Sequence, residues 1–87
     1  MTAYVYLLWC GPRRTLYCGW TTDVARRLAA HRAGKGAKYT RSRGPIELAA
    51  VIAMPSASEA RREEARIKRL SRAQKLALVA RSRARRP

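Results

Sequence analysis

Residues 3–20 read AYVYLLWCGPRRTLYCGW, two apolar stretches rich in aromatic residues, separated by GPRR at positions 11–14. Aromatic and β-branched residues favour strands, and Gly next to Pro marks a turn. The stretch therefore predicts a β-hairpin. Its first strand runs from Ala3 to Cys10 and is buried, and its second runs from Thr15 to Trp20.

The four-residue turn also predicts which residues of the hairpin face one another. Tyr6 falls opposite Gly19, and Leu8 falls opposite Tyr17. Tyr6 and Tyr17 then become diagonal neighbours on one face of the hairpin, within reach of aromatic side chains. Gly19 leaves open space beside Tyr6. For an arbitrary hairpin, ordinary cross-strand packing is the commoner explanation of both tyrosines.

Length and cysteine content limit the class of protein. A chain of 87 residues suffices for one small domain, expected here over residues 1–80 with a basic tail at 81–87. Cys10 and Cys18 point to opposite hairpin faces, so we expect no disulfide, and their spacing does not suit zinc. The sequence shows no membrane-spanning stretch and no signal peptide. We therefore expect a cytoplasmic protein that does not bind membranes.

The charge is strongly one-sided, with 20 Lys and Arg against 5 Asp and Glu and a formal net charge of +15. Such a field attracts polyanions. A basic membrane-binding helix would carry large apolar residues on one face, whereas the C-terminal segment has mainly small ones. Nucleic acid is therefore the expected partner, with DNA favoured and RNA as the alternative.

The rest of the chain predicts a helix, a strand and two further helices. Thr21 or Thr22 is expected to cap the first helix, with Asp23 in its first turn. The predicted order is β-β-α-β-α-α, a small α+β domain with helices packed on a three-stranded, mainly antiparallel sheet. The expected ranges are helix 23–32, basic loop 34–45, strand 46–54, helix 57–70 opened by a capping box at Ser56–Glu59, and helix 72–80 capped by Ser71.

The first helix carries polar residues beside its packing stripe. Val24, Arg27, Leu28 and His31 follow a helical spacing, so they share one side of the helix. Val24 and Leu28 would pack on the sheet, with Arg27 and His31 pointing toward the tyrosine face. Taken singly, a solvated arginine and a histidine favoured by the helix dipole are the commoner explanations.

One acidic residue falls on the inward stripe of the second predicted helix. Glu64 lies between Ala60 and Ile67, which are both expected to face the core. An inward carboxylate in so basic a chain would either pair with an arginine such as Arg27 or hold a divalent cation. The ion pair with Arg27 is the simpler expectation from the residues alone.

Together, these residues resemble the GIY-YIG nuclease superfamily, and in particular its small stand-alone bacterial members. Tyr4-Val5-Tyr6 stands where the family has Gly-Ile-Tyr, and Tyr17-Cys18-Gly19 where it has Tyr-Ile-Gly. The segments DVARRLAAH (23–31) and GKGAKYTR (34–41) and the pattern EARIK (64–68) extend the likeness over residues 2–80. Tyr4 replaces the first motif glycine, and the chain has no Asn, which many members use near the scissile phosphate.

The resemblance implies a Mg²⁺- or Mn²⁺-dependent endonuclease. Tyr6 and Tyr17 would orient or deprotonate the attacking water, and His31 would belong to the network around that base. Arg27 would be the catalytic arginine, Glu64 the metal ligand and Gly19 the motif glycine. The activity implied is hydrolysis of DNA phosphodiester bonds, directed by DNA structure and serving repair or recombination.

Basic residues outside this cluster are expected to contact nucleic acid. They lie in the hairpin turn and in the loop after the first helix, and are Arg13, Arg14, Lys35, Lys38, Arg41 and Arg43. No separate specificity module is apparent, so a protein partner could supply specificity. The alternative function is a non-catalytic nucleic-acid-binding module on the same scaffold.

Overall fold

The computed structural model describes residues 2–35 and 45–84. The elements of this part follow the predicted order, so the α+β fold is confirmed. They are β1 (Ala3–Cys10), β2 (Thr15–Thr21), α1 (Val24–Arg32), β3 (Ile46–Met54), α3 (Ala57–Lys68) and α4 (Arg72–Ala84).

The sheet has the strand order β2-β1-β3, with β1 antiparallel to both neighbours. The central place suits β1 because it carries no charged side chain and most of its residues are buried. Tyr6 pairs with Gly19 and Leu8 with Tyr17, as the turn length predicts. The hairpin and its register are therefore confirmed, and β2 is an edge strand.

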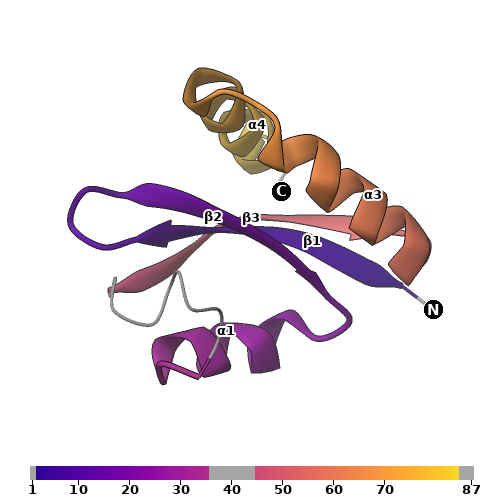
Figure 1. Cartoon of the computed structure of the whole chain (residues 1–87), viewed down its shortest axis with the longest axis horizontal. Coiled ribbons are helices and arrows are strands. Elements are labelled where there is room, and N and C mark those ends of the chain that lie inside the picture. Colours follow the sequence, from indigo (N-terminus) through magenta and orange to yellow (C-terminus); the bar gives the residue numbers. More distant parts are fainter. Residues whose placement is uncertain (1, 36–44, 85–87) are drawn as a thin grey trace.

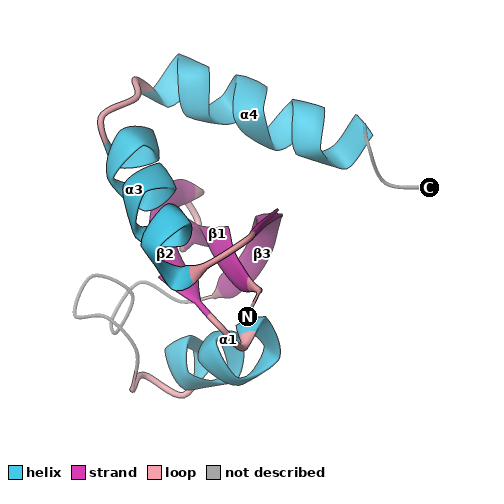
Figure 2. Ribbon diagram, turned by 90° about the vertical axis from the view of Figure 1, so that its right-hand side faces the viewer, coloured by secondary structure: helices cyan, strands magenta, loops and turns pink. Residues whose placement is uncertain are grey.

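The helices cover the two faces of the sheet unequally (Figure 1). α1 lies on one face, whereas α3 and α4 lie on the other, and α4 turns sharply away from α3 (Figure 2). Alternation along the strands divides the core accordingly. Val5, Leu7 and Cys18 pack with Ile67 of α3 on one side. On the other side is a smaller cluster of Tyr6, Leu8, Cys10 and Ile46 with Leu28 of α1.

The two cysteines lie in different core clusters and do not form a disulfide, as the alternation predicts. Within the described residues, no helix is both long and apolar enough to cross a membrane.

The start of α1 differs from the prediction. Asp23, expected inside the first turn, is the N-cap, and its carboxylate accepts the Arg26 backbone N–H at 3.1 Å. Thr21 instead accepts the Asp23 backbone N–H at 3.1 Å through its hydroxyl. The assignment of the cap to Thr21 or Thr22 was wrong, because Asp caps as well as Ser or Thr and here stands one residue closer to the helix.

The last two helices also end differently. α3 stops at Lys68 because Arg69 and Leu70 donate to carbonyls three residues back, a tighter turn that closes the helix. Ser71 then caps α4 as predicted, accepting the Gln74 N–H at 3.2 Å, while Gln74 accepts the Ser71 N–H at 2.9 Å. α4 continues to Ala84 rather than Ala80. No Gly or Pro interrupts residues 72–84, so the first residues of the expected tail are helical.

Candidate active site

Three aromatic rings meet on the α1 face of the sheet. The Tyr6 hydroxyl lies 2.9 Å from Nε2 of His31. The Tyr17 ring centroid lies 6.5 Å from that of Tyr6 and 5.3 Å from that of His31. β1, β2 and α1 each contribute one ring, and the hairpin register together with the helical spacing brings them into contact.

Gly19 makes this arrangement possible. A Cβ atom built at position 19 would lie 2.5 Å from the Tyr6 hydroxyl and 2.7 Å from its Cζ. The tyrosine therefore fills the space that the missing side chain leaves, and its ring lies directly against the backbone of the partner strand. Glycine is required here by the close approach of that ring.

His31 is the buried polar side chain of this face, with 1% of its surface exposed. Burial, and then the nearby Arg27 cation, lower its pKa below the usual 6.5, so the imidazole is neutral at neutral pH. A neutral imidazole nitrogen either accepts the Tyr6 O–H or donates to the phenol oxygen, according to its tautomer. In either case, one proton lies in the hydrogen bond between the Tyr6 oxygen and Nε2 of His31.

Arg27 approaches the same phenol from the solvent side. Burial raises the pKa of Tyr6 above 10.0, and a hydrogen bond with Arg27 opposes that rise. The Arg27 residue is exposed, and none of the described carboxylates lies within ion-pair distance of it. Its guanidinium therefore keeps donors facing solvent, where they can bind a phosphate bidentately.

Glu64 lies on the α3 side of the sheet, opposite the ring cluster, and acts on that cluster through its charge. Burial and then Glu64 raise the pKa of Tyr17 above 10.0, and the same two causes raise the pKa of Cys18 to about 11. Adjacent strand residues point to opposite faces. Tyr17 and Cys18 therefore face opposite sides of β2, and the Glu64 charge affects both. Glu64 itself lines the α3 side of the sheet next to Trp20, whereas the two phenols lie on the α1 side.

The ion pair expected between Glu64 and Arg27 is not formed. Glu64 pairs with Lys68 one turn along α3 at 3.5 Å, whereas Arg27 stands on α1 across the sheet. Helical spacing identified the inward side of each helix but did not reveal that the two helices cover opposite faces. The expectation was wrong for that reason.

Glu64 is the acidic side chain of this site that suits a hard cation. Among the described residues, no three His, Cys, Asp or Glu side chains gather in a way that would hold a metal ion. One carboxylate fits a Mg²⁺ or Mn²⁺ ion that keeps waters and takes its other ligands from a substrate phosphate. Such an ion would complete its coordination only with the nucleic acid bound.

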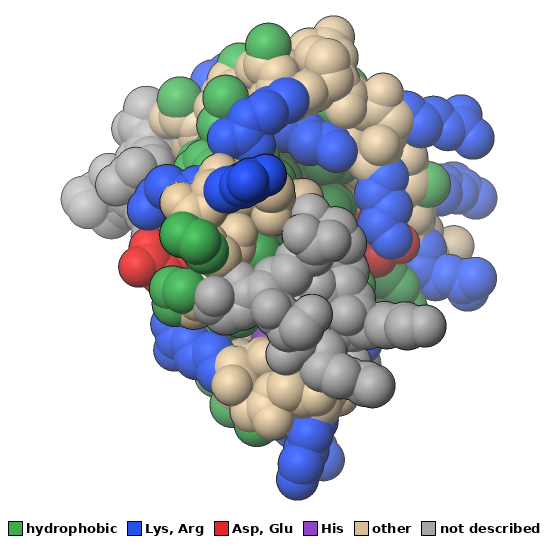
Figure 3. Space-filling model, turned by 60° about the vertical axis from the view of Figure 1, so that its left-hand side comes forward, with side chains coloured by type: hydrophobic (Ala, Val, Ile, Leu, Met, Phe, Trp, Pro, Cys, Tyr) green, Lys and Arg blue, Asp and Glu red, His purple; other side chains and the backbone are tan. Residues whose placement is uncertain are grey.

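The expected nucleic-acid contacts are placed only in part. Arg13, Arg14 and Lys35 are exposed, whereas Lys38, Arg41 and Arg43 lie outside the described residues. On the face in Figure 3, Lys and Arg side chains are widespread and acidic ones occupy small areas.

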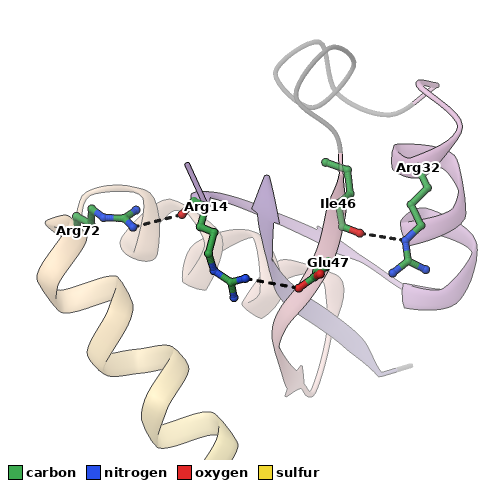
Figure 4. Close-up of polar contacts among 5 residues, drawn as sticks. All are labelled: Arg14, Arg32, Ile46, Glu47 and Arg72. Atoms are coloured by element: carbon green, nitrogen blue, oxygen red, sulfur yellow. Dashed lines mark hydrogen bonds and ion pairs between the residues drawn. The ribbon is translucent and has the colours of Figure 1, made fainter. Parts of the chain in front are cut away.

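Arg14 is held by several contacts at the hairpin turn (Figure 4). Its guanidinium lies 4.6 Å from the Trp9 ring centroid and 3.8 Å from the Glu47 carboxylate. Its carbonyl accepts a hydrogen bond from Arg72 at 3.3 Å. Arg14 therefore has partners at the hairpin turn, of which the exposed ion pair with Glu47 contributes little. Figure 4 also shows Arg32 donating to the Ile46 carbonyl at 3.1 Å, which ties α1 to β3.

Trp20 was not predicted as a site residue. It lines a groove with residues of α3, namely Ser58, Arg61, Arg62, Glu64 and Ala65. Strand alternation places Trp20 on the face opposite Tyr17, a signal that the sequence carries but that pointed only to core packing. The packing of α3 against β2 makes the groove, and the sequence pattern alone does not reveal that packing.

A phenol pair, an imidazole and an exposed guanidinium on one face of a small α+β sheet, with a carboxylate on the other face, form the candidate site. Comparison with known proteins shows the class of protein. The family model of the GIY-YIG catalytic domain matches residues 2–77. The chain belongs to the GIY-YIG family, a family of nuclease domains that act on nucleic acids.

Two relatives and two solved structures show how far the similarity extends. A UPF0213 protein of Cupriavidus pinatubonensis is 56% identical over 77 residues, covering 88% of this chain and 84% of that protein. A UPF0213 protein of Halalkalibacterium halodurans is 53% identical over 79 residues, covering 91% and 83%.

The solution NMR structure of the UPF0213 protein from Bacillus halodurans has a TM-score of 0.58 at 52% identity, covering 92% of this chain and 84% of that one. The NMR structure of an E. faecalis protein has a TM-score of 0.65 at 34% identity, covering 100% and 92%. The fold described above is therefore that of these small proteins.

Proposed function

We propose that this protein is a Mg²⁺- or Mn²⁺-dependent endonuclease that hydrolyses DNA phosphodiester bonds. Its choice of substrate would follow DNA structure rather than sequence, as suits an enzyme of cytoplasmic DNA repair or recombination. The observation that carries the proposal is the contact of the Tyr6 hydroxyl with both His31, at 2.9 Å, and Arg27. This pairing gives a buried phenol a proton acceptor and a cation at once.

The phenols would serve as the route for the proton of the attacking water. A phenol is a weak base near neutral pH, because its usual pKa is about 10. Arg27 beside Tyr6 favours the phenolate, and neutral His31 can hold the proton that Tyr6 gives up. Tyr17 is more exposed than Tyr6. Glu64 also ranks higher among the causes that raise the pKa of Tyr17 than among those that act on Tyr6. Water could therefore approach the phenols from the Tyr17 side.

Arg27 would bind the scissile phosphate. Charge develops on the phosphate oxygens as water attacks, and a fixed bidentate guanidinium stabilises that charge better than a lysine ammonium. The hydrogen bond to Tyr6 orients the side chain for this role. A divalent ion held by Glu64 would supply Lewis-acid stabilisation of the phosphate when bound.

The test is cleavage of branched, flapped and linear DNA in Mn²⁺ by the wild type and by Glu64→Ala. We expect the variant to lose at least about 100-fold in rate while still binding DNA, as happens when one stabilising group is removed from an active site. Glu63→Ala is the matched control. It removes the same charge from the adjacent residue, which pairs with Arg66 at 2.6 Å instead of lining the site.

Cleavage that persists in Glu64→Ala would refute this site. Failure of the wild type to cut every substrate while still binding them would favour the non-catalytic binding module. Tyr6→Phe and Tyr17→Phe separate the two phenols: the base is the residue whose variant loses the larger factor in rate at unchanged DNA affinity.

A further inference from the structure

A groove beside Glu64 lies on the α3 face of the sheet, outside the ring cluster. It measures about 480 Å³ and is lined by Trp20 and by five residues of α3, Ser58, Arg61, Arg62, Glu64 and Ala65. Glu64 lines this groove together with Trp20, and its charge also raises the pKa of Tyr17 on the other face of β2. A chain lying in the groove would pass the carboxylate that is the proposed metal ligand.

Trp20 offers an aromatic surface in this groove. It is partly buried, packing against the core cluster that contains Ile67. Within the described residues, no aromatic ring and no cation stacks on it. Trp9, by contrast, has Arg14 over its ring at 4.6 Å. Trp20 is therefore fixed by the core and keeps part of its surface for a ligand.

The cations of the groove are weakly neutralised. Arg61 is exposed, and none of the described carboxylates lies within ion-pair distance of it. Arg62 pairs with Glu59 at 3.7 Å, but its side chain is 78% exposed, and such surface pairs contribute little. A negatively charged ligand would meet two arginines next to one tryptophan.

We propose that this groove holds an unpaired nucleotide of the DNA substrate, with its base stacked on Trp20 and an adjacent phosphate bound by Arg61. This inference rests on the proposed function and names its substrate class. A base inside a duplex is already stacked on both sides, so only an unpaired base can lie on the tryptophan. The preferred substrate would then carry a single strand beside the scissile bond, as a flap does.

The proposal can be tested by binding alone, in EDTA, so that it does not depend on cleavage. In a Trp9→Phe background Trp20 is the remaining tryptophan of the chain, which has two. We expect an oligothymidine to quench its fluorescence and a blunt hairpin duplex to leave it nearly unchanged. Trp20→Leu should lose at least about fivefold in affinity for the single strand, and Trp20→Phe should retain most of it.

Two further variants address the groove's charge. Arg61→Ala should weaken single-strand binding more than Arg81→Ala, which removes the same charge from α4. Glu64→Gln should bind the single strand more tightly than the wild type in EDTA, because it removes the acidic charge from the groove. The same variant should lose DNA cleavage in Mn²⁺.

Equal losses on single strand and duplex in folded Trp20→Leu, or no quenching of Trp20, would overturn the groove proposal. Loss of DNA cleavage in Glu64→Ala would not bear on it. Conversely, if the wild type cuts no DNA while the oligothymidine still quenches Trp20, the nuclease proposal is refuted and the groove proposal is supported.

Discussion

Gly19 and Tyr6 form a single unit, since the tyrosine occupies the space where a side chain at position 19 would be. Gly19→Ala must displace a ring that is 2% exposed and whose hydroxyl contacts His31 at 2.9 Å. We expect the variant to fold but to lose about 100-fold or more in cleavage rate, since the proton route is broken. DNA affinity measured in EDTA should be unchanged.

Gly34→Ala provides a comparison, because Gly34 lies outside the ring cluster and has a φ of 76°. That substitution should reduce stability through backbone strain while the rate of the folded protein is preserved. If both glycine variants lost rate alike, the Gly19 effect could not be attributed to Tyr6.

His31 links the site to the stability of the fold. Its pKa in the folded protein is below 6.5, so the unfolded chain binds the proton more readily as the pH falls below that value. The free energy of unfolding should therefore be highest above about pH 6.5 and decrease toward the lowered pKa. Urea unfolding at about pH 7.5 and about pH 5.5 measures this difference. His31→Gln should lack it, and an equal pH dependence in the variant would refute the assignment.

Two contacts of the candidate site were predictable from the sequence, each for a different reason. The turn length fixed the hairpin register and so placed Tyr6 against Gly19, as observed. Helical spacing placed His31 beside the tyrosines, also as observed. Trp20 was missed because strand alternation assigns it a face but says nothing of the groove that α3 forms next to it.

At the level of the elements, the predicted strands and helices are all present, and the differences lie at their ends. Capping residues account for the helix starts, and a tighter last turn accounts for the end of α3. Asp23 takes the cap of α1, and Ser71 with Gln74 gives α4 a reciprocal cap that supports a long helix. Glu64 shows what the sequence could not predict. Residue spacing reveals the inward side of a helix, but tertiary packing decides which face of the sheet that helix covers.

The cap of α1 is open to direct test. Asp23→Ala should lower the free energy of unfolding by about 1 kcal/mol, because it removes the acceptor of the Arg26 N–H. Thr22→Ala, a change at the neighbouring exposed residue, should alter it by less than about 0.5 kcal/mol. Denaturant unfolding of the two variants distinguishes the observed cap from the one first expected. A larger loss for Thr22→Ala would contradict it.

Over the whole molecule, each acidic side chain already has a partner within the protein. Of the five carboxylates, four pair with Lys or Arg and Asp23 caps α1. The sequence has four times as many Lys and Arg residues as acids, 20 against 5. The net field is positive, which favours association with the phosphate backbone.

DNA binding should consequently weaken steeply with salt. The log of the affinity should fall linearly with log salt concentration, by about 0.9 for each duplex phosphate neutralised. Arg13→Ala should reduce the slope by about that amount. Arg14→Ala should reduce it less, because Glu47 and Trp9 already engage this guanidinium. Titrations between about 50 and 200 mM salt measure both slopes. An affinity insensitive to salt would refute these contacts.

The arrangement of the site also has a consequence during protein synthesis. The first 31 residues of the chain supply Tyr6, Tyr17, Arg27 and His31, whereas Glu64 belongs to α3. Ribosomes deliver the N-terminal residues first. A nascent or truncated chain would thus display the phenols, imidazole and guanidinium before the carboxylate that would hold the metal. Cutting ability would be acquired only when α3 docks on the finished sheet, so the growing chain would not cleave nucleic acid near the ribosome.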